Sequence, residues 1–150
     1  MGQFPRSQYM VGTTPVLTSG AGMAIDFYFP RAARILRYAV VPAVAQAAHA
    51  SVVVTGEFTN AGTGGAGSTV LATFTNDSDL AASIVRKSGA WVAHDALEII
   101  TNNRPASPTN DENSWDEIAA GSVIKYIPTS AGSTPIASQH TALIEFVESD

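Results

Sequence analysis

The chain has 150 residues, a formal net charge of −5 and no cysteine. This length is typical of one domain that folds without a disulfide or metal, and the lack of cysteine excludes zinc fingers, thiol catalysis and redox chemistry. The acidic balance argues against nucleic acid as a partner, because phosphates require a basic face. Only 14% of the residues are charged, whereas an ordinary soluble domain has about 25%. This composition favours a surface that neighbouring molecules cover, although an alanine-rich sandwich would look similar.

Residues 1–20 are predicted to form an N-terminal arm, and residues 21–150 a single β-sandwich domain. The arm carries Phe4 and Tyr9 among small and polar residues with no repeating period. Large apolar groups without a core of their own usually lie on another surface, so Phe4 and Tyr9 are candidate partner contacts. A first edge strand with a frayed beginning is the alternative. Residues 1–10 lack the apolar core of a signal peptide, and the stretch 35–50 is too interrupted to span a bilayer, which predicts a soluble protein with no membrane partner.

Alternation of apolar and polar residues predicts about eight mostly antiparallel strands. Ile25, Phe27 and Phe29, for example, alternate with Asp26 and Tyr28. Turn-forming residues separate the strands, and residues 102–113 form the clearest long loop. Short strands at this spacing predict an all-β jelly roll or β-sandwich. The strands are expected near residues 23–30, 34–42, 51–59, 69–75, 82–87, 91–100, 120–128 and 140–148.

Two segments are expected to contain a short turn of helix. The alanine-rich residues 43–50 have a high helical propensity. Ser114, followed three residues later by Glu117, matches a capping box at the start of a helix. Pro30 could also open a helix over residues 30–37, but Pro42 would break it, so a strand from Arg34 is preferred.

Three patterns that resemble functional sites are better explained as ordinary structure. Residues 62–67 match GxGxxG, but a β-branched strand follows where a dinucleotide fold needs a helix, which indicates a hairpin tip. His49, His94 and His140 lie far apart without metal-ligand spacing. Residues 76–79 lack the glycine and distal glutamate of a calcium loop, which favours a solvated turn. We therefore expect no enzymatic activity, no cofactor and no metal.

Three of the eight basic residues, Arg31, Arg34 and Arg37, lie within seven positions of an otherwise acidic chain. If this segment is extended, their side chains should not share one face. Solvated strand-end arginines are one interpretation. The other is a contact with acidic groups on a partner, because the planar guanidinium pairs bidentately with carboxylates. All three are candidate partner contacts.

The loose arm up to Gly20, the strand pair over residues 26–41 and the C-terminal pair over residues 118–126 and 141–147 together resemble small virion proteins of tailed bacteriophages. Among these virion proteins, the chain especially resembles capsid decoration, or cement, proteins. This resemblance implies a structural protein that binds the outside of a capsid as a trimer or dimer and stabilises it by bridging subunits of the major capsid protein. It also implies synthesis in the host bacterial cytoplasm and a final location on the virion surface.

Two alternatives remain open. One is a carbohydrate- or receptor-binding sandwich of a phage tail or fibre, which would expose loop aromatics such as Trp91, Trp115 or Tyr126. Trp115 is for this reason a further candidate partner contact. The other is a jelly-roll enzyme such as a cupin, which would need histidines and a carboxylate converging inside the barrel.

Overall fold

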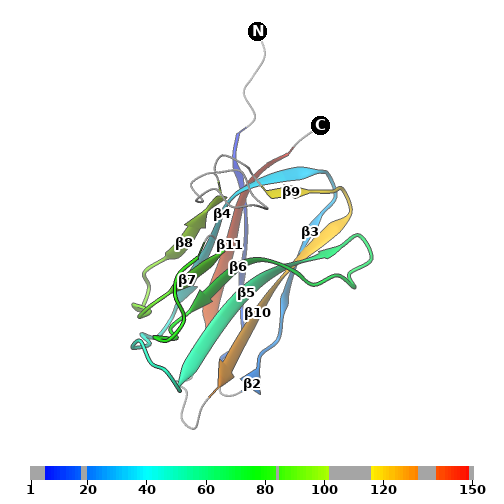
Figure 1. Cartoon of the computed structure of the whole chain (residues 1–150). Helices are drawn as coiled ribbons and strands as arrows, with labels where there is room; N and C mark the ends of the chain where they lie inside the picture. The colour runs from blue at the N-terminus through cyan, green and yellow to red at the C-terminus, as the bar shows by residue number, and fades with distance from the viewer. Residues whose placement is uncertain (1–5, 18–19, 84, 102–115, 132–137, 149–150) are drawn as a thin grey trace.

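Two β-sheets lie face to face in the computed structural model, which describes residues 6–17, 20–83, 85–101, 116–131 and 138–148 (Figure 1). The first, here called the β4 sheet, has the order β1 (Gln8–Thr13), β11 (His140–Glu148), β4 (Ala33–Pro42) and β8 (Leu97–Ile100), and β9 (Asp116–Ile118) also pairs with β4. The second, the β10 sheet, has the order β2 (Gly20–Ala21), β10 (Ser122–Ala131), β5 (Val53–Gly62), β6 (Thr69–Thr75) and β7 (Arg86–Ser88), and β3 (Ile25–Phe29) also pairs with β10. The strand pairs are antiparallel except for β6 with β7. The predicted all-β sandwich is confirmed.

The period-two alternation places one face of each long strand in a single core. Along β11 and β10, buried and half-buried residues alternate without interruption. Phe58 lies at the centre, and its ring centroid is 5.1 Å from that of Tyr38 and 5.0 Å from that of Tyr126. Tyr38 belongs to one sheet and Tyr126 to the other, so Phe58 helps to join the layers. Other fully buried side chains of this core are Phe29, Ile35, Val40, Val54, Phe74, Trp91, Ile124 and Ile144.

Part of the predicted arm belongs to the sandwich. Residues 8–13 form the edge strand β1, which pairs with β11 along its whole length. Leu17 is buried in the core and bridges to Ser138. Residues 8–17 therefore match the alternative of a first edge strand, because β11 offers them a hydrogen-bonding partner that no sequence pattern could reveal. Phe4 lies outside the described residues.

The other differences from the prediction concern short segments. Residues 43–50 form no helix and instead make isolated bridges from Gln46 to Trp91 and from His49 to Asp77. Residues 116–118, predicted to open a helix after Ser114, are strand β9. In both cases tertiary pairing overrides local propensity. The predicted long loop over residues 102–113 lies outside the described part of the chain.

Two turns differ in how well the sequence predicted them. Residues 62–67 connect β5 to β6, and Gly62 and Gly65 both have φ of +71°, so the hairpin tip is confirmed. The strand predicted over residues 91–100 begins only at Leu97, because His94 adopts a φ of +59° in a turn.

Among the residues that the structure describes, no helix has the length and apolar character of a membrane span.

Candidate interaction surface

The outer face of the β4 sheet brings together three of the predicted contact residues. Tyr9 on β1 lies directly across from Glu145 on β11, and Glu145 lies directly across from Arg37 on β4. Arg34 shares this face, because the pairing of β11 with β4 shifts register between Glu145 and Phe146. A bulge of this kind adds one residue to a strand and changes which side chains share a face. The prediction that the arginines do not share a face is therefore wrong for Arg34 and Arg37.

Each of the three arginines forms an ion pair with glutamate side chains of other strands. Arg31 Nη1 lies 3.5 Å from Glu148 Oε2, and Arg34 Nε lies 2.9 Å from Glu117 Oε1. Arg37 has two partners: its Nε lies 3.0 Å from Glu145 Oε2, and its Nη1 contacts Glu98 Oε1. The charges of the arginines are thus largely compensated inside the chain. A partner that bound these guanidinium groups through its own carboxylates would have to compete with the resident glutamates.

The ion pairs of Arg37 are expected to matter for stability, whereas the pair of Arg31 is not. Arg37 to Met should lower the free energy of unfolding by about 1–3 kcal/mol, because Glu98 and Glu145 would be left half-buried without a counter-charge. Arg31 to Met should change it by less than about 0.5 kcal/mol, since the Arg31 side chain is 76% exposed and exposed pairs contribute little. Urea unfolding at pH 7 measures both values. Equal effects of the two substitutions would contradict the assigned roles.

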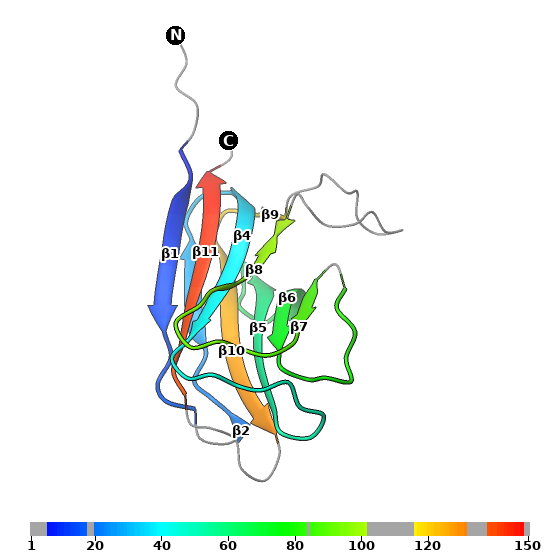
Figure 2. The same cartoon turned by 90° about the vertical axis from the view of Figure 1, so that its left-hand side faces the viewer.

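One side of the sandwich exposes an unusual share of large apolar side chains. Strand β1 occurs at the end of the strand order of its sheet, with β11 as its neighbour, and Figure 2 shows it at the outer edge. Strand β3 adjoins β1 there, because Gly12 packs against Ile25. Five of the nine exposed large apolar side chains found in the described residues come from β1, β3 and their connection. We call this set the apolar edge: Tyr9, Val11, Val16, Met23 and Tyr28.

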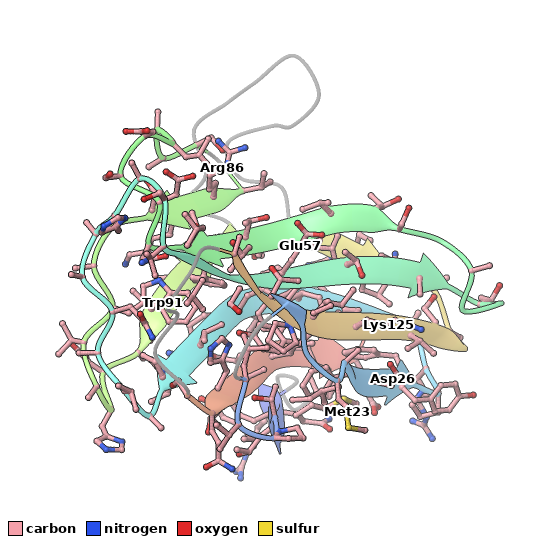
Figure 3. All side chains as sticks on the ribbon, turned by 90° about the horizontal axis from the view of Figure 1, so that it is seen from below. Met23, Asp26, Glu57, Arg86, Trp91 and Lys125 are labelled. Carbon is pink, nitrogen blue, oxygen red and sulfur yellow. The ribbon has the colours of Figure 1, made fainter. Side chains whose placement is uncertain are left out.

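Tyr28 shares the outer face of the β10 sheet with Asp26, but away from Tyr28 this face carries charged residues. Asp26, Lys125 and Glu57 come from the adjoining strands β3, β10 and β5, as Figure 3 shows, and Lys125 is directly across from Asp26. Opposite charges at such cross-strand positions suit a solvated face. The apolar edge is therefore the part of the described surface best suited to contact with another protein.

A polar cluster joins the two sheets inside the sandwich. The hydroxyl of Tyr126 on β10 lies 2.7 Å from Nδ1 of His140 on β11. The ring of Trp91 meets the His140 ring edge-on, at a centroid distance of 5.0 Å. Gly56 makes room for the tyrosine, because a Cβ at Gly56 would lie only 2.0 Å from the Tyr126 hydroxyl oxygen. All four residues are buried.

Burial controls the charge of this cluster. It lowers the pKa of His140 from 6.5 to about 4 and raises the pKa of Tyr126 well above 10, because a low-dielectric interior disfavours the charged form. Both groups are thus neutral at pH 7. Nε2 of His140 and Nε1 of Trp91 are buried and have no hydrogen-bond partner among the described residues. The cluster links the sheets and is uncharged at neutral pH.

The sequence interpretation missed this cluster, although a signal was present. His140 lies in phase with Ala142 and Ile144, and Tyr126 lies in phase with Ile124. Their positions in the alternation therefore place both side chains on the inner faces. Trp91 and Tyr126, two of the aromatics that a sugar-binding module would expose, are both buried and cannot contact a sugar at the surface. Trp115 lies outside the described residues.

The histidines do not converge. His140 is buried, whereas His49 and His94 are exposed in connections between strands. Among the residues that the structure describes, no three histidine, aspartate or glutamate side chains are arranged to hold a metal ion. The predicted solvated turn over residues 76–79 is only partly correct, because Asn76 is buried. Its Oδ1 accepts a hydrogen bond from Val54 N and its Nδ2 donates to Ala47 O and Val52 O.

No protein-family model and no curated protein matches this chain. Weak likenesses to solved structures exist. A chain of infectious bursal disease virus, Gx strain, has a TM-score of 0.37 and 14% identity over 95% of this chain and 32% of that chain. A chain of the Gt strain has a TM-score of 0.30 and 12% identity over 96% of this chain and 32% of that chain. A chain of the T13 particle of the same virus has a TM-score of 0.27 and 9% identity over 96% of this chain and 40% of that chain. This chain spans well under half of each solved chain, and scores this low do not establish a common fold.

Proposed function

We propose that this protein is a structural component of a virus particle, and more specifically a decoration protein of a tailed-bacteriophage capsid. It binds the outside of the capsid, bridges subunits of the major capsid protein and acts as a homo-oligomer. It is made in the cytoplasm of the host bacterium and functions on the virion surface. In this proposal the protein is not an enzyme, requires no cofactor and binds neither nucleic acid nor a membrane.

The apolar edge is the observation that carries the proposal. Met23 is 72% exposed, and Tyr28 and Val11 are each 58% exposed. Side chains of this size gain free energy when a partner removes them from water, by about 25 cal/mol for each Å² of apolar surface. These side chains come from β1, β3 and their connection, and β1 and β3 adjoin; exposed apolar groups on adjoining elements mark a surface for protein contact. The arginines, in contrast, already have partners within the chain.

The composition is consistent with repeated, individually weak contacts. A capsid presents the same site many times, so that a modest interface in each copy becomes strong through multivalency when the copies are joined. Few surface charges reduce the cost of removing that surface from water. The sandwich itself supplies a rigid body, because both of its sheets share one core.

Co-sedimentation tests this proposal. Capsids that lack the protein are prepared by deleting its gene from the viral genome, and purified protein is added before sedimentation through a glycerol cushion. We expect the chain to sediment with these capsids to saturation, and not with wild-type capsids, whose sites are occupied. The proposal would be overturned if the protein failed to sediment with capsids that lack it, or if it were absent from purified wild-type virions.

A pair of variants locates the contact. Met23 to Lys should weaken binding to capsids that lack the protein at least tenfold, because it places a charge within the apolar edge. Val92 to Lys makes the same change at a residue that is 57% exposed outside this edge, and it should leave binding unchanged. Both variants should fold, since neither side chain is buried.

A further inference from the structure

Strand β1 has a hydrogen-bonding edge without a partner strand in the described structure. Thr14 N donates to His140 O at 2.8 Å, and Thr14 and His140 continue the β1–β11 register by one position. Hydrogen-bonded and non-hydrogen-bonded pairs alternate along an antiparallel ladder. Gly12 and Met10 therefore bond to β11, whereas the main-chain groups of Tyr9, Val11 and Thr13 point away from it, toward the open edge.

This edge lacks the features that usually prevent strand addition. Natural edge strands are commonly short, charged or interrupted by proline. Strand β7, at the edge of the other sheet, has three residues and contains Arg86 and Lys87. Strand β8 has four residues and contains Glu98. Strand β1 has six residues, QYMVGT, with neither a charge nor a proline.

We propose that the open edge of β1 pairs with β1 of a second copy of this chain, antiparallel and with a two-fold axis at Val11. The β4 sheets of the two copies then form one continuous sheet. Tyr9 lies across from Thr13 of the other copy, and Val11 lies across from its own counterpart. The pairing would form about six main-chain hydrogen bonds. It deepens the homo-oligomer part of the proposed function by giving the contact and its symmetry.

The side chains favour a second copy as the occupant. Because β1 is uncharged, self-pairing places no like charges opposite one another. On the inner face this register sets Met10 across from Gly12 of the other copy, at the closely spaced, non-hydrogen-bonded positions. Met10 packs against the core. Gly12 cannot be replaced by a larger residue without a shift, because a Cβ at Gly12 would lie only 2.8 Å from Ile25 Cγ2. A large residue thus faces the smallest one twice, as a two-fold axis requires.

The dimer should be weak when the chain is free in solution. Pairing of two six-residue strands buries less surface than the roughly 1,200–2,000 Å² of a stable interface. We therefore expect a Kd of about 10 µM to 1 mM. Attachment of both copies to neighbouring capsid sites would strengthen the same contact through a high effective concentration.

Cysteine crosslinking tests both the contact and its register. The chain has no natural cysteine, so each introduced thiol is unique. Val11 to Cys should form a disulfide-linked dimer under mild oxidation, because opposed strand residues lie within disulfide reach. Tyr9 to Cys alone should not crosslink, whereas a mixture of Tyr9 to Cys and Thr13 to Cys chains should. Val70 to Cys, on the other sheet and 42% exposed, gives the background of random collision.

Sedimentation equilibrium provides a measurement without crosslinking. Val11 to Lys sets two ammonium groups against each other at the axis and should raise the dimer Kd at least tenfold, while urea unfolding remains as in the parent chain. A parent chain that stays monomeric at about 1 mM, Val11 to Cys that links no faster than Val70 to Cys, or Tyr9 to Cys that links with Val11 to Cys would each overturn the two-fold pairing at Val11. These measurements use the chain alone, so their failure is distinguishable from a failure to bind capsids.

Discussion

Replacing Phe58 by alanine is expected to lower the free energy of unfolding by about 3–5 kcal/mol. Phe58 is completely buried, and its ring packs between Tyr38 of the β4 sheet and Tyr126 of its own sheet. It also meets Phe74 edge-on at a centroid distance of 6.2 Å. Truncation leaves a cavity lined by three large rings, which β-strand pairing holds in place and which cannot collapse into the space.

Urea unfolding, followed by tryptophan fluorescence, measures this loss as a lower midpoint at constant slope. Tyr28 to Ala is the matched control, because it removes an aromatic ring from the same sheet at a position that is 58% exposed, and it should change stability by less than about 0.5 kcal/mol. Domains of this size are stable by only about 5–15 kcal/mol, so the Phe58 variant should be close to unfolding. A loss below about 1.5 kcal/mol would contradict the central role of this ring.

Stability is also expected to fall by about 3 kcal/mol between pH 6.5 and pH 4 because of His140 alone. Its pKa is about 4 in the folded protein and 6.5 in the unfolded chain. Above pH 6.5 the imidazole is neutral in both states, and the folded protein has its full stability. As the pH falls toward 4, the unfolded chain binds a proton that the buried histidine does not, which favours unfolding. Below pH 4 both states are protonated and His140 contributes no further loss.

His140 to Asn separates this effect from that of the carboxylates. The amide can still form a hydrogen bond with the Tyr126 hydroxyl, but it does not titrate. Urea midpoints at pH 7, 5.5 and 4.5 should therefore fall less steeply for this variant than for the parent chain. Val92 to Asn, at an exposed position that does not titrate, should retain the parent dependence. If the His140 variant kept the parent slope, the acid sensitivity would have to arise elsewhere.

The sequence alone was sufficient for the architecture of the long strands. In strands such as β10, β11 and β6, apolar residues recur at every second position, so the period-two pattern located each of them to within three residues. It also predicted the hairpin at residues 62–67 and its unsuitability for a dinucleotide. These features depend on local backbone chemistry, namely which residues favour a pleated strand and which favour a left-handed turn.

The interaction surface depended on tertiary structure. Whether residues 8–13 form an arm or a strand is decided by β11, more than 120 residues away. Whether Arg34 and Arg37 share a face is decided by a bulge opposite Glu145, and whether they are free is decided by glutamates on three other strands. Alternation determines which side of a strand faces inward, because the backbone of a strand points successive side chains to opposite faces. It does not determine which strand lies alongside, because hydrogen bonds between strands join residues whose order along the chain carries no sign of their proximity.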